Sequence, residues 1–239
     1  MRTTTFLLGL TLAIASCGHS SQDGYTINGK VKNCGEWADG GHIVLIIQDE
    51  GTQIVDTANV IKGRFRLTGR IEHPDFVTMY PSMSDSDERP NGRIMFFLEN
   101  EKYSITIKNN RISEQYLKGG TSETLFREMS KHQSELNRKY DIESIDRQMN
   151  TTLTPEYRME KLRVIKHEYD SVSKAYKDSI ILANTPSYFS LYMTARIIAA
   201  GENLDSIRKA LEVYRQYDKF KDDPRLQRMI EITEGKRRP

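Results

Sequence analysis

Residues 54–71 read IVDTANVIKGRFRLTGRI and contain two runs of strand-forming residues on either side of Lys62-Gly63. Glycine supplies the positive φ that a tight turn requires, so the segment predicts a β-hairpin with arms Ile54 to Ile61 and Arg64 to Ile71. In the second arm apolar side chains such as Phe65 and Leu67 alternate with basic ones. One face of this arm is therefore expected to join a core and the other to face water.

Further strand-like runs lie on both sides of this hairpin, and turn residues separate them. Residues 35–41, between the first two runs, are expected to be a loop. About seven short strands predict an antiparallel β-sandwich over residues 25–120, with a partly open barrel as the alternative. The additional runs are Tyr25–Lys32, Ile43–Ile47, Phe76–Tyr80, Arg93–Leu98 and Tyr103–Ile107.

The spacing of the apolar residues changes to a helical period near Gly119-Gly120, so residues 121–239 are expected to be entirely helical. Thr121 or Ser122 is expected to cap the first helix. Thr154-Pro155-Glu156 combines a cap, a proline at the first helical position and an acid in the first turn. It opens one long helix over residues 155–183, roughly 43 Å at about 1.5 Å per residue.

The long helix carries a regular stripe of Leu, Ile, Val and Tyr at steps of three and four residues. Such a stripe predicts antiparallel pairing with the preceding helix or a coiled-coil contact with another chain. Three shorter helices are expected to follow, at Ser187–Ala200, Leu204–Tyr217 and Arg225–Glu234.

The N-terminus has the anatomy of a secretory signal peptide over residues 1–16, with Arg2 followed by the apolar run Phe6 to Ala15. Ile14-Ala15-Ser16-Cys17 resembles the bacterial lipobox, in which cleavage precedes the cysteine and that cysteine is lipidated. Residues 17–24 then form a polar, lipidated tether. The apolar run is too short to span a bilayer, so we expect the membrane contact to be made through the lipid on Cys17.

The bulk composition restricts the classes of partner. A formal net charge of +2 offers no electrostatic reason to expect a nucleic acid partner. With 37% hydrophobic residues the chain is polar on average but is expected to fold.

No local pattern marks a catalytic, cofactor-binding or metal site. The 5 histidines lack metal-ligand spacing, and Asp85, Asp87 and Glu88 lack the glycine and distal glutamate of a calcium loop. The sequence has no nucleophile elbow, phosphate loop or dinucleotide fingerprint. We therefore assign no catalytic residue, cofactor or metal ligand, and the sequence favours a protein that is not an enzyme. A hydrolase whose groups converge without a local motif stays an alternative.

Cysteine use leaves a single thiol once Cys17 carries lipid. Cys34 then has no partner for an intramolecular disulfide, and a buried or inert thiol is the expected state. The alternative is a redox role for Cys34. Four segments also resemble the three-residue acceptor of O-glycosylation known in some bacteria, and a modified site would have to be exposed. They are Asp56-Thr57-Ala58, Asp170-Ser171-Val172, Asp178-Ser179-Ile180 and Asp205-Ser206-Ile207.

Residues 25–120 resemble a β-rich domain of unassigned function found at the front of many lipoproteins from Gram-negative gut-type bacteria. The resemblance rests on residues 25–31, on Asp56-Thr57-Ala58 and Gly63-Arg64-Phe65, on residues 69–74 and on Phe96-Phe97-Leu98-Glu99. It implies a helical stretch like residues 121–234 and then a thioredoxin-like domain with a Cys-x-x-Cys site. The sequence contains no Cys-x-x-Cys, so that activity is not carried over.

Together these observations predict a non-enzymatic cell-envelope lipoprotein, anchored through Cys17 on the periplasmic side of the outer membrane of a Gram-negative bacterium. Its expected role is protein interaction or scaffolding, with a protein partner or a second copy of itself. One alternative is an accessory role in periplasmic thiol–disulfide exchange through Cys34. Another is an outer-surface binder of ligands or glycans, for which an aromatic platform would rest on Trp37 alone in the β-rich part.

Overall fold

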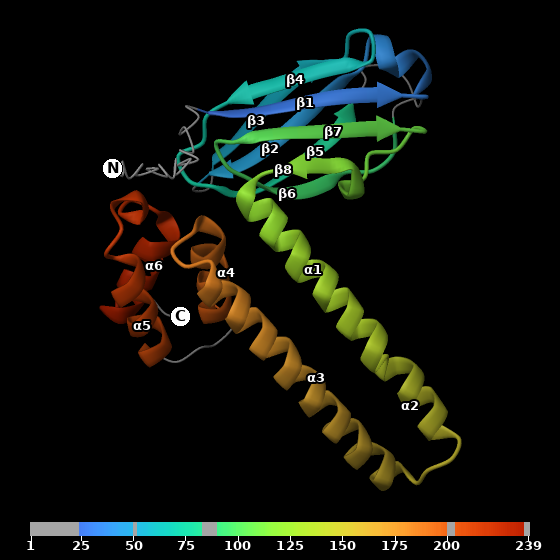
Figure 1. Ribbon diagram of the computed structural model, residues 1–239, viewed down its shortest axis with the longest axis vertical. Coiled ribbons are helices and arrows are strands. Elements are labelled where there is room, and N and C mark those ends of the chain that lie inside the picture. Colours follow the sequence, from blue (N-terminus) through green and yellow to red (C-terminus); the bar gives the residue numbers. More distant parts are fainter. Residues whose placement is uncertain (1–23, 50–51, 83–89, 200–203, 237–239) are drawn as a thin grey trace, which may run out of the picture.

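The computed structural model describes residues 24–49, 52–82, 90–199 and 204–236. Its β-rich part has eight strands in two four-stranded sheets, with strand orders β4-β1-β7-β8 and β3-β2-β5-β6 (Figure 1). The strands are β1 (Tyr25–Lys32), β2 (His42–Asp49), β3 (Thr52–Asn59), β4 (Arg64–Gly69), β5 (Asp75–Ser82), β6 (Ile94–Leu98), β7 (Lys102–Lys108) and β8 (Leu117–Gly119).

The two sheets share one hydrophobic core. Ile27 and Leu67 from the first sheet and Leu45 and Met79 from the second are at most 1% exposed and belong to the same cluster. Alternation along each strand sends every second side chain into this core, as a half-buried strand requires. The arrangement fits the expected sandwich, and the fold class is α+β because helices follow the strands.

One strand pair departs from the expected antiparallel arrangement. β1 and β7 run parallel, with Thr26 opposite Lys102 and Lys32 opposite Lys108. A parallel pair needs a long connection, and here the chain from β2 to β6 provides it. The expectation of wholly antiparallel sheets is therefore wrong at this pair. The structure has one strand more than the seven or so expected. The additional strand is β8, whose 3 residues are too few to show an alternating pattern.

The expected hairpin over residues 54–71 is correct at its turn and wrong in its pairing. Ile61 and Arg64 exchange both main-chain hydrogen bonds, and Lys62 and Gly63 have φ of 48° and 68°. β3 then pairs with β2, whereas β4 pairs with β1 in the other sheet. The segment is thus a corner that carries the chain from one sheet to the other.

The arms separate because a short 3₁₀ helix, η1 (Gly35–Asp39), lies where a loop was expected. Apart from the Ile61–Arg64 pair, main-chain groups near the turn bond to η1 and to the residues just after it. Gly63 N–H donates to Ala38 O at 2.7 Å, and Val60 N–H donates to Gly41 O at 2.7 Å. Trp37 of η1 is fully buried in the shared core.

The helices follow as α1 (Thr121–Tyr140), α2 (Ile142–Asn150), α3 (Pro155–Ala183), α4 (Tyr188–Ala199), α5 (Leu204–Tyr214) and α6 (Pro224–Thr233), with short 3₁₀ turns η2 (Glu114–Tyr116) and η3 (Asp218–Phe220). The 29 residues of α3 confirm the expected long helix. α1 and α2 run antiparallel to α3 and form a long hairpin that projects away from the sheets (Figure 1). None of the described helices is both long and apolar enough to cross a membrane.

The stripe on α3 packs within this hairpin. Tyr169 OH donates to Asn137 Oδ1 at 2.6 Å, and the ring of Tyr176 stacks on His132 at a centroid distance of 3.6 Å. Ile180 belongs to the same apolar cluster as Met129 of α1. The sequence left two partners open for the stripe, the preceding helix or another chain. Within this chain the stripe packs against the preceding helix. The last three helices enclose a small core of their own that includes Leu191, Leu211, Phe220, Leu226 and Met229.

Candidate functional site

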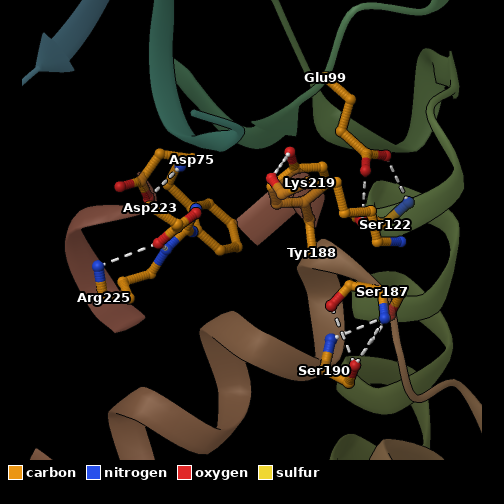
Figure 2. Close-up of polar contacts among 10 residues, drawn as sticks. Asp75, Glu99, Ser122, Ser187, Tyr188, Ser190, Lys219, Asp223 and Arg225 are labelled. Atoms are coloured by element: carbon orange, nitrogen blue, oxygen red, sulfur yellow. Dashed lines mark hydrogen bonds and ion pairs between the residues drawn. The ribbon is translucent and has the colours of Figure 1, made fainter. Parts of the chain in front are cut away.

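The junction between the sheets and the helices is made by the carboxylate of Glu99. Ser122 N–H and Ser122 Oγ donate to Glu99 Oε2 and Oε1, each at 2.7 Å (Figure 2). Thr121 N–H donates in the same way to Glu101 Oε2 at 3.0 Å. The first N–H groups of a helix lack partners within the helix, and a negative charge is favourable at this end.

The cap of α1 therefore differs from the expected one. Gly120 occupies the N-cap position and has no side chain that could accept a capping hydrogen bond. The prediction that Thr121 or Ser122 would cap the helix with its own side chain is wrong. Acids from the turn between β6 and β7 cap it instead, so the start of α1 is set by a tertiary contact.

The hydroxyl of Tyr103 bonds to the main chain of the turn between β6 and β7. Its hydroxyl donates to Phe97 O at 3.1 Å and accepts from Glu99 N–H at 2.9 Å. The side chain is 2% exposed, and burial raises the pKa of its phenol. The hydroxyl thus stays neutral and satisfies two main-chain groups at once.

A second carboxylate, that of Glu123, ties α1 to the edge strand β6. Phe97 N–H donates to Glu123 Oε2 at 2.7 Å, and Arg127 forms an ion pair with the same carboxylate. An edge strand otherwise presents unpaired N–H groups to any passing chain. Glu123 occupies one of these groups and fixes the helix against the sheet.

Burial is the main influence on both carboxylates. Glu99 is 9% exposed and Glu123 is 2% exposed, and this desolvation raises the pKa of each carboxyl above its usual value. The hydrogen bonds from Ser122 to Glu99, and from Phe97 and Arg127 to Glu123, partly oppose the rise. The junction therefore holds two acids whose charged forms are costly to bury.

The C-terminal helices reach the same end of the sheets. Asp223 is 1% exposed and caps α6 by accepting from Arg225 N–H at 2.9 Å, while Arg225 Nη2 donates to Asp223 Oδ2 at 2.6 Å. Asp75 of β5 lies beside this pair (Figure 2). Burial lowers the pKa of Arg225, but the hydrogen bond and charge of Asp223, together with the charge of Asp75, outweigh it and raise that pKa. Tyr192 of α4 packs its ring on Phe97, with centroids 5.4 Å apart.

The side chains of Ser190 and Lys219 near this end donate to main-chain acceptors. Lys219 Nζ donates to Pro186 O at 2.9 Å, and the Ser190 hydroxyl has Ser187 O and Asn184 O as acceptors at 2.9 and 3.2 Å. Desolvation lowers the pKa of Lys219, and the charge of Glu99 opposes that shift. These groups lock the entry to α4 rather than form the hydroxyl–base pair of a hydrolase.

The junction fixes a groove between α1, α3 and α4, which we take as the candidate functional site. Phe126, Met129 and Met193 form its apolar floor, and its volume is about 710 Å³. Lys177 and Arg196 stand on its rim. Flexible methionines on a concave apolar floor suit a surface that adapts to another protein. No local sequence pattern indicated this groove, because it forms only where α1 packs beside the consecutive helices α3 and α4.

Of the residues singled out in the sequence, Asp170 and Asp178 of the candidate glycosylation segments line the groove, whereas Cys34 and Trp37 do not. Cys17, Asp85, Asp87 and Glu88 lie outside the described residues. Cys34 is 2% exposed and its Sγ donates to Lys32 O at 3.2 Å. Trp37 is fully buried and its Nε1 donates to Ser82 O at 2.9 Å. Within the described ranges no group of His, Cys, Asp and Glu side chains is placed to hold a metal ion.

The candidate acceptors of O-glycosylation differ in accessibility. Thr57 on strand β3 and Ser171 on α3 are exposed. Ser179 is also exposed, but its hydroxyl donates to Tyr176 O at 2.8 Å. The side chains of Asp205 and Ser206 lie outside what the structure describes. Three of the candidate hydroxyls are therefore exposed, and that of Ser179 differs from those of Thr57 and Ser171 in donating to the helix main chain.

One known family matches part of the chain. Residues 25–126 match a family described as Domain of unknown function (DUF4369). No curated protein and no solved structure matches the chain. The expected likeness to a domain of unassigned function is thus confirmed for this part. The match runs past the strands to Phe126, so it includes Glu99, Ser122 and Glu123 at the junction.

Replacing Glu99 with Ala is expected to lower the free energy of unfolding by about 2–4 kcal/mol. The change leaves the N–H and hydroxyl of Ser122 buried without an acceptor, and each such group costs about 1–3 kcal/mol. Urea unfolding followed by circular dichroism measures the effect. Glu114→Ala is the control, because Glu114 makes a half-exposed 3.5 Å ion pair with Arg127 and should cost less than about 1 kcal/mol. Equal losses in the two variants would contradict the role of Glu99.

Stability is expected to depend on pH through Glu99. Because its folded-state pKa is raised, the contribution of this group is fully present below its pKa in the unfolded chain and is lost as pH rises through the folded pKa. Glu99→Gln has no proton to lose at this position. The stability of the unsubstituted chain relative to Glu99→Gln should therefore fall as the pH rises above about 4.3, the pKa of Glu in an unfolded chain. Urea unfolding of both chains at several pH values tests this, and a relative stability that rises with pH would refute it.

Proposed function

We propose that the protein is a non-enzymatic, lipid-anchored lipoprotein of the cell envelope that binds a protein partner through its helical part. The observation that carries the proposal is the groove between α1, α3 and α4, with an apolar floor and a charged rim. The buried junction at Glu99 and Glu123 supports it, because α1 starts from two contacts with the sheet. A groove with fixed walls loses less conformational entropy when a partner is bound.

The rim suggests the chemistry of the partner. Lys174 is paired with Asp178 at 3.1 Å, so these two charges largely cancel. Lys177, Arg196 and Asp170 are left along the groove, with a net positive charge. The partner segment is accordingly one that presents apolar side chains to the floor, with acidic residues beside them. A second copy of the chain is the alternative partner.

The anchor is the second part of the proposal. Ile14-Ala15-Ser16-Cys17 supports lipidation of Cys17, and residues 18–24 connect it to β1. We place the protein on the periplasmic side of the outer membrane, where the folded body would face soluble and membrane-bound partners.

The other functions considered from the sequence have less support. Thiol exchange requires an accessible thiolate, and the sulfur of Cys34 is buried and hydrogen-bonded to Lys32 O. A glycan platform requires an exposed aromatic face, and Trp37 is fully buried. For these reasons we favour the interaction module over both.

Replacing Cys17 with Ala is expected to abolish lipidation and release the protein from the membrane. In cells that make the unsubstituted chain, mass spectrometry of the N-terminal peptide should show acyl chains on Cys17 and no residue before it. The Cys17→Ala chain should show neither change. Cys34→Ser is the matched control and should keep the lipid. An unmodified N-terminus in the unsubstituted chain would refute the anchor.

Crosslinking in cells tests the groove. A photo-reactive phenylalanine analogue at Lys177 or Arg196 should capture one dominant protein, because both positions stand on the rim. The control position is Lys131 of α1, which is exposed and does not line the groove. We expect at least about fivefold more adduct from the rim positions than from the control.

Each outcome of this experiment is informative. Capture of a different protein supports the interaction module and identifies its partner, and capture of a second copy supports self-association. Equal yields at the rim and at Lys131, or no protein adduct at any position, would contradict the groove as the binding site.

A further inference from the structure

The outward face of the sheet β4-β1-β7-β8 is uniformly basic. None of these strands contains Asp or Glu. Their inward positions are apolar and buried, so the charged side chains all lie on the opposite face. We define this basic face by Lys30, Lys32, Arg64, Arg66, Lys102, Lys108 and Lys118, of which Lys108 is partly exposed and the others are exposed.

The strand register brings these cations together. Arg64 lies opposite Lys30, and Lys32 lies opposite Lys108. Like charges directly opposite each other on a sheet destabilise the pair. The folded protein therefore carries an electrostatic cost on this face that a bound anion would relieve.

The face also has a shallow basin suited to polar groups. Lys30, Arg64, Arg66 and Lys118 surround it, Ser104 lies among them, and the basin has a volume of about 600 Å³. Guanidinium and ammonium groups bind phosphate oxygens, and hydroxyls add further hydrogen bonds. This combination matches the phosphate and hydroxyl groups of a phospholipid headgroup.

The nearby acids bond to groups outside the basic face, and Glu101 and Asp56 keep their negative charge because their donors are neutral. Glu114 pairs with Arg127, Glu101 accepts from Thr121, and Asp56 accepts from Tyr25 OH at 2.9 Å. In the described part of the chain, no lysine or arginine of the basic face takes part in a recorded ion pair. The positive charge is thus available to an external partner.

The helices leave this face open. α1 contacts β6 and β8 at one edge, and no helix crosses the four strands in Figure 1. The start of β1 at Tyr25 is about eight residues from Cys17, a span of less than about 30 Å even when fully extended. If Cys17 is anchored as proposed above, the membrane lies within reach of the face.

We propose that the basic face binds the anionic phospholipid headgroups of the membrane in which Cys17 is anchored. A basic surface beside a lipid anchor adds electrostatic attraction to an anionic leaflet and so strengthens membrane binding. The broad, open face suits a membrane surface. We favour the membrane over other polyanions because the short segment between Cys17 and β1 would hold the face close to it. The inference rests on the anchor of the proposed function for its location, but not for its chemistry.

Vesicle binding tests the proposal without the lipid. The mature chain, residues 17–239 with Cys17→Ser, is mixed with vesicles of phosphatidylcholine alone or with about 30% phosphatidylglycerol, and binding is measured by co-sedimentation. We expect at least about tenfold tighter binding to the anionic vesicles, because each basic residue near such a surface contributes to attraction. Raising NaCl from about 0.05 to 0.5 M should largely abolish the preference.

The variants use matched changes of charge. Lys30→Gln, Arg64→Gln, Arg66→Gln and Lys118→Gln together should reduce the preference at least about tenfold. The control chain carries the same loss of charge on exposed positions outside the sheets, with Arg138, Lys166, Lys221 and Arg228 changed to Gln. It should bind within about twofold of the unsubstituted chain. Circular dichroism establishes that both variants fold.

Three results would overturn the proposal. They are equal binding to the two kinds of vesicle, equal losses in the two quadruple variants, and tighter binding to duplex DNA or heparin than to anionic vesicles at equal anion concentration. Because the assay uses a chain without lipid, a failure of lipidation in cells would leave its result unchanged. Failure of the anchor and failure of the basic face are therefore distinguishable.

Discussion

The contact on which the rest of the structure depends is the capping of α1 by Glu99. Glu99 directly follows β6. Its carboxylate accepts two hydrogen bonds from Ser122 and sets where the first helix begins. Glu123 returns the contact by accepting from Phe97 N–H on the same strand. Two buried acids are costly, and they are tolerated because each is satisfied by donors from the opposite element. The direction of the helical hairpin follows from this reciprocal pair.

The junction also separates two surfaces of different chemistry. The groove between α1, α3 and α4 has an apolar floor and mixed charges on its rim, which suits a protein segment. The face of sheet β4-β1-β7-β8 is polar and of one charge sign, which suits an anionic surface. A lipoprotein with both would hold its sheet at the membrane and offer its helices to a partner. Charge that is buried here is compensated, whereas charge on the sheet face is left for an external anion.

Sequence reasoning succeeded where neighbouring residues determine the outcome and failed where distant ones compete. Thr154-Pro155-Glu156 starts α3 at Pro155 as expected, because a proline at the first position of a helix needs only local geometry. Lys62-Gly63 likewise forms the expected turn. The pairing of the arms around that turn was wrong, because η1 takes hydrogen bonds that the hairpin would have used. The cap of α1 was wrong for the same reason, since Glu99 outcompetes the local hydroxyls.

The sequence by itself determined the alternation of the strands, the change to a helical period near Gly120, the length of α3 and the likeness to a domain of unassigned function. These depend on periodicity and on turn or cap residues, which act over a few positions. Only the tertiary structure decided the parallel pairing of β1 with β7, the junction at Glu99 and Glu123, the groove and the continuity of the basic face. Each of these joins residues far apart in the chain, and their free energy comes from burial, charge and hydrogen bonds that exist only after the elements have packed.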